Sequence, residues 1–152
     1  MPNIPANLLT ELRLSSALRN EDEVTRFEDA LAEVAALDDP DAIPELTELL
    51  DDSSDRPEVM FSIVHLIEDF EFGEYFSRLL PVLPRLSQRA PYWATVLHTR
   101  ILNSPQARGI YAEEARRADP AAREAARAML RSIRERKPKF ADACDEVLTH
   151  AV

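Results

Sequence analysis

Glycine is nearly absent from this chain of 152 residues, which contains only Gly73 and Gly109. Loops that cradle phosphate groups need several glycines, because their backbone must approach the anion closely. Nucleotide-binding loops of the Rossmann and Walker types are therefore excluded. Cys144 is the only cysteine, so the chain cannot form an internal disulfide bond.

Long apolar runs are missing as well. No run approaches the ~20 residues needed to cross a bilayer, and residues 1–9 show no basic segment ahead of an apolar one. No segment has the strict alternation of a β-strand. With 45% apolar residues the chain should fold as one domain. We therefore expect a soluble, cytoplasmic protein without membrane contact.

Proline, in contrast, is frequent, with 11 residues, and marks where helices begin. Proline suits the first helical turn, because its φ is already helical and its missing N–H would be unbonded there. Apolar spacing predicts nine helices, over residues 5–18, 21–37, 43–50, 57–72, 74–86, 91–102, 105–117, 120–136 and 138–149. Pro81 and Pro84 should bend or split the fifth helix. Gly73 is expected to end the fourth in a left-handed conformation.

The intervals between prolines leave room for helical hairpins of about 35 residues. We therefore predict an all-α fold, a right-handed stack of antiparallel helical hairpins that forms one helical-repeat domain over residues 1–152. Residues 38–52 (DDPDAIPELTELLDD) resemble the first helix of a HEAT repeat, and residues 79–86 resemble a degenerate copy. The resemblance implies a HEAT-like α-solenoid in which the second helix of each hairpin lines the binding face.

Charge is distributed unevenly along the chain. Residues 11–74 contain 20 acidic residues and four arginines, whereas the rest contains eight acidic and 14 basic residues, so the two parts carry about −16 and +6. A segregated field of this kind steers association with a partner of opposite charge. The alternative is that the acidic residues only keep the protein soluble.

Catalytic and metal sites find little support in the sequence. His65 and Asp69 lie one helical turn apart, but the two other histidines are badly spaced to complete a metal site. Cys144 falls on the apolar side of the last helix, which favours a place in the core. We therefore expect no catalytic residue, no metal and no cofactor. The arginines of the eighth helix could contact nucleic acid, but the net charge of −10 argues against it.

A binding surface is predicted on the exposed side of the fourth and sixth helices. Glu58, His65 and Asp69 share one face of the fourth helix, because three or four residues separate neighbouring positions of the polar stripe that they form with Ser62. On the sixth helix, Thr95 is expected to continue a polar stripe that starts at Tyr92, an aromatic anchor unless it packs in the core. The predicted partner-binding residues are Glu58, His65, Glu68, Asp69, Glu71 and Tyr92.

Residues 57–70 (PEVMFSIVHLIEDF) and 92–104 (YWATVLHTRILNS) resemble small all-helical immunity proteins of bacterial polymorphic toxin systems, including contact-dependent growth inhibition. Such proteins neutralise the toxic C-terminal domain of a large effector by binding it in the cytoplasm. The resemblance implies a protein partner, and it leaves open the oligomeric state and whether the toxin is a nuclease. A HEAT-like scaffold or adaptor is the alternative function, and an enzyme that uses His65 and the neighbouring acids is a third.

Overall fold

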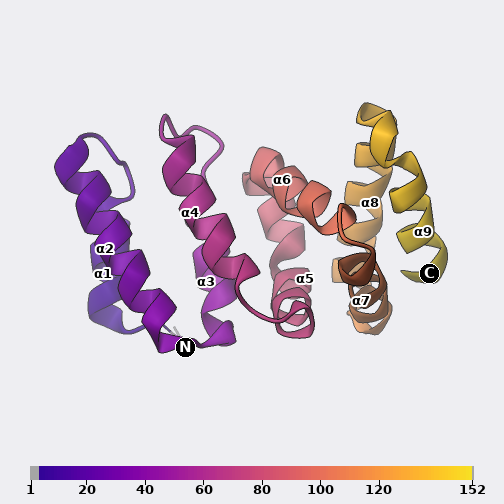
Figure 1. Ribbon diagram of the computed structural model, residues 1–152, viewed down its shortest axis with the longest axis horizontal. Helices are drawn as coiled ribbons and strands as arrows, with labels where there is room; N and C mark the ends of the chain where they lie inside the picture. Colours follow the sequence, from indigo (N-terminus) through magenta and orange to yellow (C-terminus); the bar gives the residue numbers. More distant parts are fainter. Residues whose placement is uncertain (1–3, 152) are drawn as a thin grey trace. The chain divides into compact units, whose positions relative to one another are not determined.

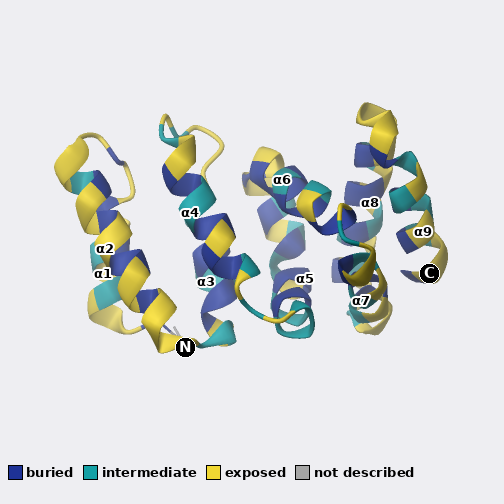
Figure 2. Ribbon diagram, viewed as in Figure 1, coloured by how far each residue is buried: buried dark blue, intermediate teal, exposed yellow. Residues whose placement is uncertain are grey.

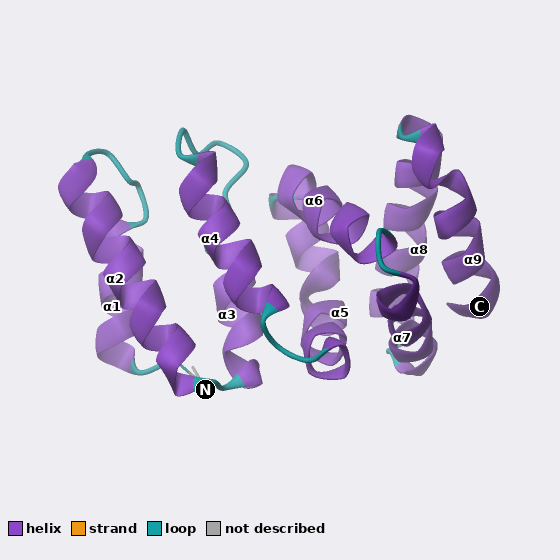
Figure 3. Cartoon of the chain, viewed as in Figure 1, coloured by secondary structure: helices purple, strands orange, loops and turns teal. Residues whose placement is uncertain are grey.

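The computed structural model describes residues 4–151. Every regular element in this range is helical, with nine α-helices, two short 3-10 helices and no strand (Figure 3). The predicted all-α class is therefore confirmed. The chain forms two compact units, Met1–Phe70 (unit 1) and Glu71–Val152 (unit 2), and each is described by itself. The single repeat domain, the handedness of the stack and its HEAT-like character stay predictions.

Unit 1 contains two consecutive helical hairpins. Its helices are α1 (Ala6–Ser15), α2 (Glu21–Leu37), α3 (Ile43–Thr47), which follows the 3-10 turn Pro40–Ala42, and α4 (Pro57–Glu68). α2 packs against α1 and α4, and α3 packs against α4. α2 and α4 thus lie side by side in front of α1 and α3 (Figure 1). The fully buried side chains of this unit include Leu12, Phe27, Ile43, Leu46, Ile63 and Ile67.

Unit 2 contains the longest helix and four others. Its helices are α5 (Phe72–Arg89), α6 (Pro91–Leu102), α7 (Pro105–Arg117), α8 (Pro120–Arg136) and α9 (Ala141–Ala151), which follows the 3-10 turn Pro138–Phe140. α5 packs against α6, α7 and α8, and α9 packs against α7 and α8. In each helix the buried residues recur on one side, as the amphipathic pattern predicts (Figure 2).

Three predicted helix starts are fixed by side-chain caps. Asn20 accepts a hydrogen bond from the backbone N–H of residue 23, Ser104 from that of residue 107, and Asp119 from that of residue 122. Each cap gives a partner to an N–H group that the first turn of a helix cannot bond internally. The starts of α2, α7 and α8 therefore agree with the sequence prediction.

The fifth helix is expected to bend or split at its prolines, and of these two alternatives the split is wrong, because α5 continues through both Pro81 and Pro84. An interior proline costs a helix roughly 3 kcal/mol or more. Pro81 is exposed and Pro84 half-buried, so neither ring interrupts the fully buried row of Leu79, Leu80 and Leu83. Burying each such side chain contributes about 1.5–3 kcal/mol, which offsets the two proline penalties.

Several other helix ends also differ from the prediction. α4 ends at Glu68, and Gly73 belongs to α5, where its φ is not positive, so the proposed glycine cap is wrong. The residue that caps a helix in the left-handed conformation is instead Asp38, at the end of α2, with φ 49°. α3 begins at Ile43 as predicted but already ends at Thr47. α9 begins at Ala141, later than predicted, because Pro138 begins a 3-10 turn, and it continues to Ala151.

Candidate protein-binding surface

α4 has the predicted exposed and buried sides. Glu58, His65 and Asp69 are exposed and Glu68 is half-buried. On the opposite side Val59, Ile63 and Ile67 are completely buried. The side chains that could meet a partner on α4 are therefore mainly acidic.

A second helix contributes to the same face. The Oγ of Ser62 on α4 lies 3.5 Å from Oε2 of Glu28 on α2, and an ion pair of 2.8 Å joins Arg56, just before α4, to Glu21 of α2. Glu28 therefore belongs beside the acidic residues of α4. We call this surface the α2–α4 face and define it by Glu28, Glu58, Ser62, His65 and Asp69. Sequence reasoning missed Glu28, because helical periodicity identifies its exposed side but not the helix beside it.

The negative charge of unit 1 is mostly not compensated within the unit. Unit 1 contains 18 acidic residues and four arginines, a formal charge of −14. Three of those arginines, Arg19, Arg26 and Arg56, each form an ion pair with one carboxylate. Within residues 4–151 no ion pair involves Glu28, Glu58 or Asp69. The α2–α4 face therefore presents unpaired carboxylates to solvent.

Unit 2 differs in its balance of charge. It contains ten acidic and 14 basic residues, a formal charge of +4, and many of its charges are paired internally. Arginines pair with Glu113, Glu114, Glu124, Asp145 and Glu146. The boundary between the two units thus divides the acidic part of the chain from the weakly basic part.

The predicted binding residues are distributed over both units. Glu58, His65, Glu68 and Asp69 lie in unit 1, whereas Glu71 and Tyr92 lie in unit 2. Glu71 is exposed and immediately precedes α5. Tyr92 is 60% exposed in the first turn of α6, so the alternative of a core position is wrong for this residue. Four of the six predicted residues therefore belong to unit 1, and three of these four lie on the α2–α4 face.

Thr95 does not continue the polar stripe of α6. Its side chain is only 7% exposed, because α8 covers it. The hydroxyl donates a hydrogen bond of 2.9 Å to the carbonyl of Pro91 and accepts one of 3.3 Å from Nη2 of Arg136. Thr95 is therefore a polar link between α6 and α8.

Sequence reasoning also missed a buried polar pair, His98 of α6 and Tyr111 of α7. Nδ1 of His98 lies 2.7 Å from the carbonyl of Ala94, which can only accept, so Nδ1 carries the proton. Nε2 then accepts the Tyr111 hydroxyl at 2.7 Å. Burial lowers the pKa of His98 to about 4 and raises the pKa of Tyr111. This neutral pair joins two helices and is closed to solvent.

The described residues offer little for catalysis or metal binding. Within residues 4–151, no three His, Cys, Asp or Glu side chains are grouped closely enough to hold a metal ion. The Cys144 side chain is completely buried, as predicted, and burial raises the pKa of its thiol. None of the helices formed by these residues combines the length and apolar character required to span a bilayer.

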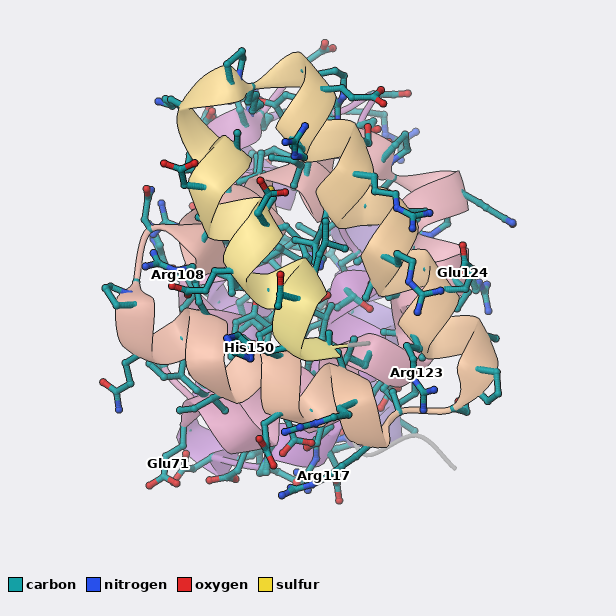
Figure 4. All side chains as sticks on the ribbon, turned by 90° about the vertical axis from the view of Figure 1, so that its right-hand side faces the viewer. Glu71, Arg108, Arg117, Arg123, Glu124 and His150 are labelled. Carbon is teal, nitrogen blue, oxygen red and sulfur yellow. The ribbon has the colours of Figure 1, made fainter. Side chains whose placement is uncertain are left out.

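A pocket of about 400 Å³ lies in unit 2, between α7 and α9. One of its lining residues is Arg108, which is labelled in Figure 4. Its central polar feature is an ion pair of 2.7 Å between Arg108 and Glu146. Arg108 also donates to the carbonyl of Leu102 at 2.7 Å. Arg108 therefore mainly joins three helices, and its charge is already compensated.

The described part of the chain is helical, its main candidate site is a charged helix face, and it contains no cluster of catalytic or metal-binding side chains. These are the features of a protein that binds another protein. The sequence profile of the Immunity protein 30 family matches residues 14–111, more than half of the chain. The chain therefore belongs to this immunity-protein family, which indicates a role against a toxin. Searches of curated proteins and of solved structures found no match. The matched range contains all six predicted binding residues.

Proposed function

We propose that this chain neutralises a cognate bacterial toxin domain by binding it directly in the cytoplasm, and that the α2–α4 face is the contact surface. The observation that carries the proposal is the group of unpaired carboxylates on that face. Neutralisation needs only occupation of the toxin surface, so the proposal includes no catalytic step and no cofactor. The toxin belongs to a polymorphic system such as contact-dependent growth inhibition.

The electrostatic argument concerns Glu28, Glu58 and Asp69. Because no ion pair among residues 4–151 involves these side chains, they repel one another and the other acids of unit 1 in the free protein. A basic partner removes that repulsion and adds attraction, so it is favoured over neutral or acidic surfaces. A nuclease, whose cleft is basic because it binds phosphates, is the toxin type that this surface fits best.

The arrangement of helices supports the same surface. α1–α2 and α3–α4 are consecutive hairpins, and their second helices lie side by side (Figure 1). A HEAT-like stack presents the second helix of every hairpin on its binding face. We therefore include HEAT-like stacking in the proposal, with α2 and α4 as the binding helices.

The test needs a candidate toxin: where the gene immediately upstream encodes a large protein, the C-terminal domain of that protein is purified in an inactive form. The double variant Glu58→Lys and Asp69→Lys should bind this domain at least about 30-fold more weakly than wild type, because breaking one side of a desolvated charge pair costs ~2–5 kcal/mol. The association rate of the wild type should fall as salt is added. Both substitutions are at exposed positions, so circular dichroism should be unchanged.

The matched control compares Asp69→Lys with Asp142→Lys, which makes the same change of charge at an exposed position in unit 2. Only the first should weaken binding. Full affinity of the double variant, or an association rate that ignores ionic strength, would show that the α2–α4 face is not the contact. Failure of the upstream domain to bind at all, together with capture of two host proteins, would favour the scaffold or adaptor function.

A further inference from the structure

Arg136, at the end of α8 in unit 2, is held in position without being neutralised. Its Nε donates to the hydroxyl of Ser132 at 2.9 Å, and its Nη2 donates to the hydroxyl of Thr95 at 3.3 Å. No carboxylate pairs with it among residues 4–151. The nearby Arg127 and Arg134 differ, since each forms an ion pair. Arg136 is also exposed, so its charge is available to a partner.

An exposed aromatic side chain, Tyr92, lies on the same helix as Thr95, whose hydroxyl accepts from Arg136. Tyr92 and Thr95 are three residues apart on α6 and so share one face of the helix. The Tyr92 ring meets the ring of Trp93 edge-on, with centroids 5.1 Å apart and planes at 90°. Trp93 is only 3% exposed, so it supports Tyr92 from the core. We call Tyr92 and Arg136 the anchor pair.

The free donors of Arg136 define the chemistry of its partner. A guanidinium has five N–H groups, of which two are occupied here, and the remaining ones can form the fork that fits the two oxygens of a carboxylate. Because hydroxyls already position the side chain, little conformational freedom is lost when a partner binds. Tyrosine and arginine are also the side chains that, with tryptophan, most often dominate binding energy at protein interfaces.

We propose that the anchor pair is a second contact site for the toxin domain, where Arg136 binds a carboxylate of the toxin and Tyr92 packs against the apolar surface around it. This inference rests on the proposed function and adds to it. The toxin then presents a basic area to the α2–α4 face and an acidic side chain to unit 2. A partner with only one of these features would be bound less tightly, which gives the chain a means of selecting its cognate toxin.

The test measures the affinity of single variants for the same upstream-encoded domain. Arg136→Gln should weaken binding at least about tenfold, as should Tyr92→Ala. Arg136→Lys should fall between wild type and Arg136→Gln, because lysine keeps the charge but loses the fork. Arg131→Gln is the matched control, since it removes the same charge from an exposed position on the same helix, and it should bind like wild type. Thermal unfolding of each variant separates a binding defect from a folding defect.

Each outcome decides between the two proposals. Loss of affinity with Arg136→Gln but not with Arg131→Gln, at unchanged thermal stability, supports the anchor pair. The anchor pair is overturned if Arg136→Gln and Tyr92→Ala bind with the affinity of the wild type while the double variant Glu58→Lys and Asp69→Lys loses binding. The proposed function then stays intact. Equal losses with Arg136→Gln and Arg131→Gln also overturn it, because they show a general effect of charge.

Discussion

The pair of His98 and Tyr111 predicts a loss of stability in mild acid. The side chain of His98 is 1% exposed, and its pKa is lowered from 6.5 to about 4 because burial disfavours the charged ring. The unfolded chain therefore binds a proton that the folded chain excludes between these two pH values. Stability from this group is complete above pH 6.5 and is lost as the pH falls towards 4.

The magnitude follows from the pKa difference. The lowering of the His98 pKa corresponds to about 3 kcal/mol in the free energy of unfolding. Between about pH 7.5 and about pH 5, the expected loss from His98 alone is about 2 kcal/mol. That is a large fraction of the stability of a small domain.

Urea unfolding of wild type and His98→Gln at the two pH values isolates this contribution. Glutamine can still donate to the carbonyl of Ala94 but does not titrate. The variant should be less stable near neutral pH, yet its free energy of unfolding should change about 2 kcal/mol less between the two conditions. Other titrating groups cancel in this comparison. The same pH dependence in both proteins would refute the argument that His98 is buried and neutral.

Three further predictions concern single elements. Asp119→Ala should lower the free energy of unfolding by about 1 kcal/mol, because the N–H of Ala122 loses its cap, and a thermal melt measures this. Pro81→Ala should raise it by about 1–3 kcal/mol, because the exposed position gains an N–H donor for the carbonyl of Ser77; a lower urea midpoint would contradict this. Cys144 should react with a thiol reagent only as fast as the protein unfolds, since its side chain is fully buried and its thiol pKa is raised.

The candidate site was predictable only in part. Spacing along α4 was enough to place Glu58, His65 and Asp69 on one exposed face, because residues three and four apart always neighbour each other on a helix. The contribution of Glu28 required knowledge that α2 packs beside α4. The contact of Arg136 with α6, the helix that carries Tyr92, likewise depends on packing between α6 and α8, which joins residues far apart in the sequence.

The sequence alone determined the secondary structure of much of this chain through local rules. Helical periodicity, capping residues and prolines fixed the all-α class and most helix starts, because each acts within one or two turns. The charge difference between the two parts was also readable directly. Tertiary packing decided the features that local rules do not predict. It kept α5 continuous through two prolines and buried Thr95 and His98. It also determined which carboxylates and arginines form ion pairs. These outcomes depend on which helices meet, and the free energy of burying side chains between them outweighs the local preference of a single residue.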